Sequence, residues 1–73
     1  MYYDESIKVD FVIPKYIQEN IDNLIKARKE NRLDVDCEEE ELISNINRAF
    51  YSKDLTESQA MILRKKYLWW GAL

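Results

Sequence analysis

Residues 55–70 read LTESQAMILRKKYLWW, a stretch that predicts one amphipathic helix and with it a helical fold. Thr56 and Gln59 have the spacing of a capping box, in which the two side chains satisfy free backbone amides at a helix start. The apolar residues that follow at helical spacing are Ala60, Leu63, Tyr67 and Trp70, with Ile62 beside them. We therefore expect a helix over residues 56–70 whose apolar face packs on a core.

Two upstream segments carry the same periodicity and predict helices over residues 14–30 and 37–51. The first apolar stripe consists of Ile17, Ile21, Leu24 and Ile25. The second consists of Leu42, Ile43, Ile46, Ala49 and Phe50. Asn31 suits a left-handed stop of the first helix, and Asp36 with Glu39 has the form of a capped start of the second. Because so few residues separate the last two helices, we expect an antiparallel or steeply crossed pair.

Residues 7–13, IKVDFVI, alternate apolar side chains with mostly polar ones, which is the period of a half-buried β-strand. Residues 33–37, LDVDC, allow two interpretations: a second short strand, or a turn with Leu33 and Val35 pointing inward. Without a second strand, the first has to lie against the helices, pair with its twin or accept a strand from another protein. The expected fold class is mainly α, a three-helix domain with an N-terminal strand.

Length and composition indicate a single small domain, residues 1–73, with a hydrophobic fraction of 47% and one glycine. A chain of this size is near the lower limit for a self-sufficient core, so help from a second subunit is expected. Cys37 has no second cysteine to pair with and is expected to be a small core residue. No apolar run approaches the roughly 18–20 residues that cross a bilayer, and no leader opens the chain, so we expect a cytoplasmic protein without membrane contact.

The residue types needed for most catalytic and cofactor chemistry are missing from the sequence. Histidine is absent, and the only glycine is Gly71, so neither histidine-based triads nor glycine-rich phosphate loops are available. Residues 34–38 alternate carboxylates as a calcium loop does, but Glu39 and Asn45 stand where that loop needs a glycine and a bidentate glutamate. We therefore expect no enzyme, no cofactor, no metal site and no small-molecule substrate.

Two tryptophans, Trp69 and Trp70, follow directly on the predicted C-terminal helix. Indoles of this kind either fold back onto a core or meet a partner, and tryptophan and tyrosine are over-represented in interface hot spots. The predicted interface combines Tyr67, Trp69 and Trp70 with Phe11 from the strand, and its partner is another protein or a second copy. The alternative is that one indole, first of all Trp70, completes the core.

Charge is distributed unevenly: residues 34–47 hold six acids and no base, whereas residues 48–73 hold five bases and two acids. The segment from Leu55 to Tyr67 resembles the start of the helix-turn-helix unit in the fourth region of bacterial sigma factors. That resemblance implies DNA binding, with Arg64, Lys65 and Lys66 on phosphates. These three basic residues lie at the C-terminal end of the helix, however. A helix-turn-helix recognition helix presents its N-terminal residues to the DNA bases, and here Glu57 is among those residues.

Residues 11–22, FVIPKYIQENID, and 59–68, QAMILRKKYL, are similar in style to small proteins carried by mobile elements of Gram-positive bacteria. This similarity implies no activity. It suggests a bacterial setting in which small acidic proteins regulate or inhibit host enzymes, with residues 34–41 as a phosphate mimic. The sequence thus predicts a non-catalytic interaction or regulatory module that self-associates, with DNA binding and enzyme inhibition as alternatives.

Overall fold

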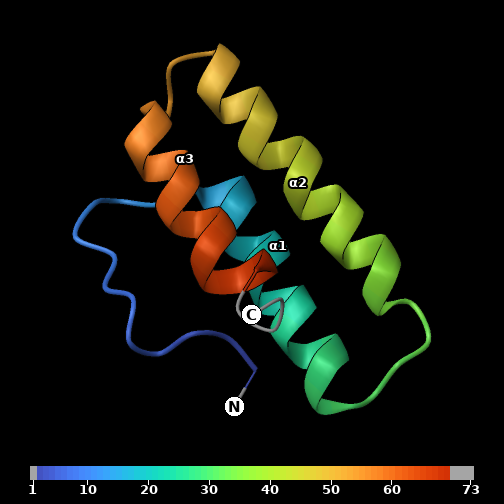
Figure 1. Cartoon of the computed structure of the whole chain (residues 1–73). Coiled ribbons are helices and arrows are strands. Elements are labelled where there is room, and N and C mark those ends of the chain that lie inside the picture. The colour runs from blue at the N-terminus through green and yellow to red at the C-terminus, as the bar shows by residue number, and fades with distance from the viewer. Residues whose placement is uncertain (1, 70–73) are drawn as a thin grey trace.

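The computed structural model describes residues 2–69, which form three helices and an N-terminal segment that lies against them (Figure 1). Helix α1 spans Lys15–Lys29, α2 spans Val35–Tyr51 and α3 spans Glu57–Leu63. A π-helical turn, η1, continues α3 over Arg64–Leu68. Helices α1 and α2 run in opposite directions, and α3 returns antiparallel to α2 (Figure 1). All three predicted helices are therefore present, and Trp70 lies outside the described residues.

One apolar core holds the three helices together, and the predicted stripes supply most of it. Its buried members are Ile17, Ile21, Leu24, Leu42, Ile46, Ala49, Leu55, Ala60, Leu63 and Tyr67. Ile43 and Phe50 of the second stripe remain exposed instead. The stripe of α2 is thus wider than the surface that α1 and α3 cover.

Helix ends follow the sequence closely in two places and depart from it in one. The capping box of α3 is confirmed: the Gln59 amide donates to Thr56 Oγ1 at 3.1 Å, and the Thr56 amide donates to Gln59 Oε1 at 3.0 Å. Asn31 has the predicted left-handed conformation, with φ of 52°. The predicted cap at Asp36 is wrong, because α2 already begins at Val35, after Asp34, whose side chain makes no cap hydrogen bond.

The predicted strand over residues 7–13 is not formed, and residues 2–69 contain no β-strand at all. The alternation of the sequence is nevertheless visible in burial. Side chains at 7, 9, 11 and 13 are half-buried against the helices, whereas those at 8, 10 and 12 are exposed. The segment belongs to an irregular strap, residues 2–13, which has one side on the core over residues 7–13. Its backbone finds no neighbouring strand, which explains why one-sided burial does not lead to a ladder here.

Residues 33–37 do not form the second strand, and the predicted inward turn is present in part: residues 33 and 34 form a turn, and Val35, but not Leu33, packs against the core. Leu33 is fully exposed in the connection between α1 and α2, and Val35 is half-buried as the first residue of α2. Cys37 is exposed, so its predicted role as a core residue is wrong. The reason is that Cys37 is out of register with the core stripe of Leu42, Ile46 and Ala49, so it lies on the solvent side of the first turn.

Candidate interaction surface

The outer side of α3 carries apolar side chains that the rest of the described chain leaves partly uncovered. We define the α3 surface as Glu57, Ser58, Met61, Ile62, Lys65 and Trp69. Four of these residues, Glu57, Ser58, Met61 and Ile62, line a shallow depression of about 330 Å³. The buried positions of the same helix are Ala60 and Leu63, so Met61 and Ile62 lie off the core-facing stripe. Two partly exposed apolar residues thus lie off the core-facing stripe in the middle of a capped helix.

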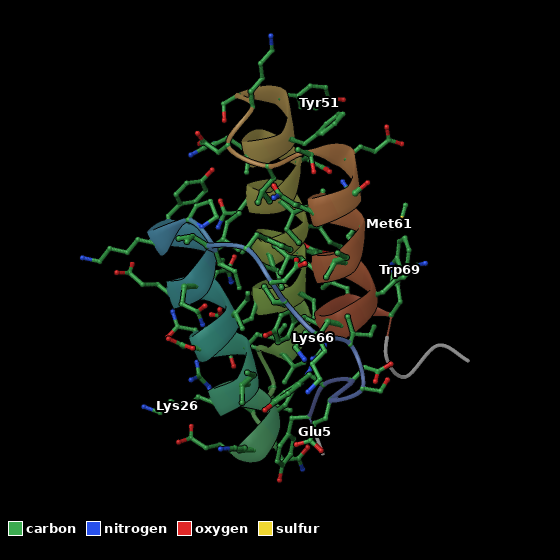
Figure 2. All side chains as sticks on the ribbon, turned by 90° about the vertical axis from the view of Figure 1, so that its left-hand side faces the viewer. Glu5, Lys26, Tyr51, Met61, Lys66 and Trp69 are labelled. Atoms are coloured by element: carbon green, nitrogen blue, oxygen red, sulfur yellow. The ribbon has the colours of Figure 1, made fainter. Side chains whose placement is uncertain are left out.

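Trp69 extends this surface at the end of η1. Its side chain is 45% exposed, and its amide donates to the Arg64 carbonyl at 2.9 Å, five residues back. Figure 2 shows Trp69 and Met61 pointing away from the bundle on the side of α3 opposite α1. Indole and thioether groups pack readily on other apolar surfaces, so the α3 surface has the composition of a contact site.

A second exposed aromatic group lies at the C-terminal end of α2. Phe50 and Tyr51 have ring centroids 5.5 Å apart, and Tyr51 is 81% exposed. The connection from this turn to α3 is short, so the pair lies near the N-terminal end of α3 (Figure 2). The molecule thus exposes aromatic side chains near both ends of the α3 surface.

The predicted interface residues are not gathered into one exposed patch. Tyr67 is buried, with 7% of its surface exposed, and its ring lies 5.6 Å from that of Tyr3. Phe11 is half-buried on the strap and packs against the core. Trp69 alone of the four is placed on the surface, and Trp70 lies outside the described residues. Sequence reasoning missed Met61 as a surface residue, although its position between Ala60 and Leu63 but off their stripe was a usable signal.

The three basic residues proposed for phosphate contacts are also separated. Lys66 is buried, with 9% exposure, and donates to the carbonyl oxygens of Asp4 at 3.1 Å and Ile7 at 2.6 Å. Arg64 is half-buried and donates to Asn47 Oδ1 at 2.6 Å. Only Lys65 is exposed. Two of the three cations are therefore engaged in intramolecular contacts.

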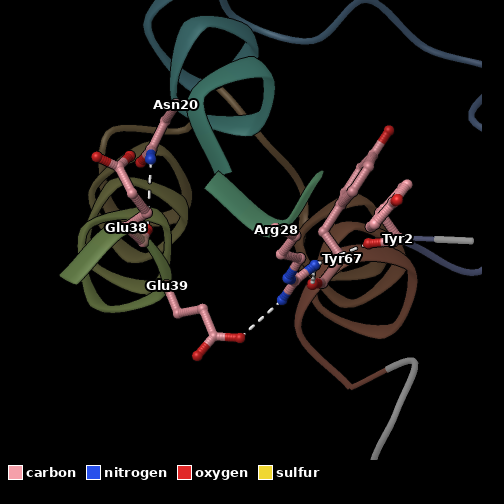
Figure 3. A network of polar contacts seen from close by, with 6 residues as sticks. All are labelled: Tyr2, Asn20, Arg28, Glu38, Glu39 and Tyr67. Carbon is pink, nitrogen blue, oxygen red and sulfur yellow. Dashed lines mark hydrogen bonds and ion pairs between the residues drawn. The ribbon is translucent and has the colours of Figure 1, made fainter. Parts of the chain in front are cut away.

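The acidic run at the start of α2 is likewise partly engaged inside the fold (Figure 3). Glu39 Oε2 accepts a hydrogen bond from Arg28 at 2.7 Å. Asp34 pairs with Arg32, and the hydrogen bond from this guanidinium holds the pKa of the Asp34 carboxyl below its usual value. Asp36 and the glutamates at 40 and 41 remain exposed. The predicted phosphate mimic is thus reduced to three exposed carboxylates spread over the first two turns.

A polar groove of about 470 Å³ runs between α1 and α2. Its lining includes Tyr16, Glu41 and Arg48, together with the buried Asn20. Asn20 is satisfied inside the fold, since it accepts from Asn45 Nδ2 at 2.8 Å and donates to the Glu38 carbonyl at 3.4 Å. Within residues 2–69, no group of three or more cysteine, aspartate or glutamate side chains is arranged to hold a metal ion. The groove is thus lined by hydrogen-bonding groups and by charges of both signs, with Glu19, Glu41 and Asp54 beside Arg48.

None of the helices in the described range has both the length and the apolar character that a bilayer crossing requires. No protein-family model matches this chain, and comparison with curated proteins and with solved structures yields no match either.

Proposed function

We propose that this chain is a non-catalytic protein-interaction module that self-associates through the α3 surface. The observation that carries the proposal is the exposed indole of Trp69 next to the partly covered Met61 and Ile62 on the outer side of one helix. An apolar group of this kind, flanked by polar residues, is typical of protein contact sites. The charged residues Glu57 and Lys65 supply such a polar rim.

The size of the domain supports an association of this kind. Within residues 2–69 the buried core contains ten residues, drawn from the three helices, from η1 and from the connection before α3. Domains of about 70 residues are marginally stable when a single core is their only support. Covering Trp69 in an assembly would add apolar burial that the isolated chain lacks, and a folded protein that assembles is stabilised by mass action.

The placement of the basic residues favours this function over DNA binding. A duplex-binding surface needs several exposed cations that contact phosphates together. Lys66 is buried and Arg64 is hydrogen-bonded to α2, so Lys65 is the one exposed cation of the three. Its neighbours on the α3 surface, Met61 and Ile62, suit an apolar partner better than a phosphate backbone.

Sedimentation equilibrium over about 5 to 500 μM, a range that spans typical weak homodimers, tests the proposal directly. We expect a mass that rises from one chain to two across this range. Ile62→Glu places a charge in the contact and should weaken association at least about tenfold, because an unpaired charge is costly to desolvate. The matched control is Leu33→Glu, which adds the same charge at a fully exposed apolar position outside the α3 surface.

Circular dichroism of both variants checks that the helices remain intact, so that loss of association is separable from loss of fold. A wild-type chain that stays at the mass of one copy up to the highest concentration contradicts self-association. Equal weakening by Ile62→Glu and Leu33→Glu contradicts the assignment to the α3 surface.

A further inference from the structure

We infer that two copies of this chain pair through α3 in antiparallel orientation, with a two-fold axis at Met61 that brings Glu57 of each copy opposite Lys65 of the other. This inference rests on the proposed self-association and specifies its geometry. Its basis is the order of charged and apolar residues on the exposed side of α3 and η1.

Glu57 and Lys65 are equally spaced about Met61 along the chain, four residues before it and four after it. Glu57 and Met61 are four residues apart within α3, so they lie on the same side, about 6 Å apart along the axis, and Lys65 follows in the first turn of η1. A two-fold axis perpendicular to the helix at Met61 exchanges the height of Glu57 along the helix with the height of Lys65. It places the carboxylate of one copy at the height of the ammonium group of the other, and the symmetry repeats this pairing once more.

Both charges are available for such a pairing. Glu57 and Lys65 are exposed, and in the part of the chain that the structure describes neither forms an ion pair. Met61 and Ile62, which lie between them, are partly covered. The surface therefore has an apolar centre with an acid at one end and a base at the other. Two copies of it are complementary in charge only when the helices run in opposite directions.

A parallel arrangement about the same helix has the opposite electrostatics. It would set Glu57 against Glu57 and Lys65 against Lys65 of the second copy, and like charges in direct contact are unfavourable. Heterologous contacts, in which the two copies use different surfaces, lead to rings or open filaments and not to a closed pair of two copies. Charge complementarity thus selects the antiparallel two-fold pair.

The exposed aromatic residues agree with the same symmetry. Trp69 follows η1 at the C-terminal end of the α3 surface, whereas the exposed Tyr51 and the turn that contains Lys53 lie near its N-terminal end. The two-fold axis therefore directs Trp69 of one copy toward the end of α2 in the other, where the exposed ring of Tyr51 lies. Aromatic packing there, or an indole beneath the Lys53 ammonium group, would cover the side chains that the monomer leaves exposed.

Charge reversal tests the pairing. Glu57→Lys and Lys65→Glu should each weaken the homodimer about tenfold, since both symmetry-related pairs become repulsive. An equimolar mixture of the two variants should form a heterodimer of near wild-type affinity, because every Lys then faces a Glu. The double variant E57K/K65E should also regain the homodimer. The matched control is Glu40→Lys, an exposed reversal on α2 that should leave association unchanged.

Disulfide trapping tests the position of the axis. In a Cys37→Ser background, Met61→Cys should cross-link two copies upon oxidation, since residues on the axis approach each other within disulfide range. Ser58→Cys is the control on the same helix, because its two copies would lie about two turns apart.

The outcomes separate this inference from the proposed function. A wild-type dimer that is insensitive to both charge reversals, or a mixture that fails to regain affinity, overturns the antiparallel pairing and leaves self-association standing. Cross-linking at position 58 but not at position 61 overturns the axis. A wild-type chain that is monomeric throughout overturns both.

Discussion

The ammonium group of Lys66 lies 2.6 Å from the carbonyl oxygen of Ile7, a residue 59 positions earlier in the chain. The same ammonium donates to the Asp4 carbonyl at 3.1 Å, and the Asp4 amide donates to the Lys66 carbonyl at 2.9 Å. The rings of Tyr3 and Tyr67 lie 5.0 and 5.7 Å from this ammonium. Lys66 thus connects the strap to η1. Carbonyl oxygens and aromatic faces stabilise its charge in place of water.

Replacing Lys66 by methionine should detach the start of the strap. Methionine retains much of the stem of the side chain but leaves the carbonyls of Asp4 and Ile7 without their charged donor. We expect a loss of about 2 kcal/mol in the free energy of unfolding, the range for hydrogen bonds that involve a charged group. Urea denaturation followed by circular dichroism measures it.

Lys26→Met provides the control, since Lys26 is exposed on α1 (Figure 2) and its removal should change stability by less than about 0.5 kcal/mol. Hydrogen exchange adds a local measurement: the Asp4 amide should lose protection in Lys66→Met. Equal stability of the two variants would show that Lys66 does not anchor the strap.

The strap shows what alternation in a sequence does and does not predict. The period of two over residues 7–13 correctly gave the side chains that face the core. It predicted a strand wrongly, because strand formation depends on a neighbour for the backbone and the rest of the described chain is helical. The Asp4 amide donates its hydrogen bond to the carbonyl of Lys66 near the end of η1, and not to a neighbouring strand.

Arg28 is a second cation that joins distant parts of the chain, and 9% of its side chain is exposed. Its guanidinium donates to the carbonyls of Tyr2 at 3.0 Å and Tyr67 at 2.8 Å, and to Glu39 Oε2 at 2.7 Å (Figure 3). The strap, α1, α2 and η1 therefore meet at one side chain. A guanidinium suits this position because its planar set of donors points in several fixed directions at once.

Arg28→Met should destabilise the fold by about 3 kcal/mol, because it removes the donor from these acceptors and leaves the partly buried Glu39 without its partner. Arg28→Lys should recover only part of this loss, since one ammonium group cannot reproduce the directions of the guanidinium. Thermal and urea unfolding compare the two variants. Full recovery in Arg28→Lys would mean that charge alone, and not donor geometry, holds the site.

Neither cation was recognisable as buried from the sequence. Lys66 belongs to the run of three bases that suggested a phosphate contact, and Arg28 belongs to the basic last turn of α1, which suits the helix dipole. Their burial depends on carbonyls that come from the strap and from η1. Such long-range contacts are not encoded in local periodicity. The position of Met61 off the core stripe, by contrast, follows from the same helical spacing that identified Ala60 and Leu63 as core, whereas Ile62 was expected beside that stripe and is half-buried.

Lys53 has a left-handed backbone, with φ of 68°, at the C-terminal end of α2. The amides of Lys53 and Asp54 donate to the carbonyls of Phe50 at 3.2 Å and Ala49 at 2.8 Å, which is the hydrogen-bond pattern of a Schellman motif. Lys53→Gly should therefore stabilise the protein by about 0.5–1 kcal/mol, because glycine adopts this conformation without strain.

Asn31 is the matched position, because it ends α1 with φ of 52° and the same pattern of hydrogen bonds. Asn31→Gly should raise the free energy of unfolding less than Lys53→Gly does, since asparagine tolerates the left-handed region better than lysine. Lys53→Val should destabilise by about 1 kcal/mol or more. Urea unfolding ranks the three variants, and a destabilised Lys53→Gly would show that the lysine side chain makes a compensating contact.

The alkaline limit of stability should depend on Tyr67. Burial raises the pKa of its phenol above the ordinary value of 10.0, and the charges of Tyr3 and Asp22 raise the pKa further. A phenol whose pKa is higher in the folded than in the unfolded state contributes stability that is present below pH 10 and lost as the pH rises through the folded value. We therefore expect the free energy of unfolding to fall above about pH 10.

Tyr67→Phe should lose less stability than the wild type between about pH 9.5 and 11, since phenylalanine has no proton to release. Tyr51→Phe is the control, because Tyr51 is exposed and its replacement should leave the pH profile unchanged. Urea unfolding at each pH supplies the comparison. The phenolate absorbance of Tyr67→Phe against the wild type separates the titration of Tyr67 from that of Tyr16, whose pKa is also raised. If Tyr67→Phe and the wild type lose stability in parallel, the alkaline transition belongs to other groups, and Tyr67 is not buried in solution as it is in this fold.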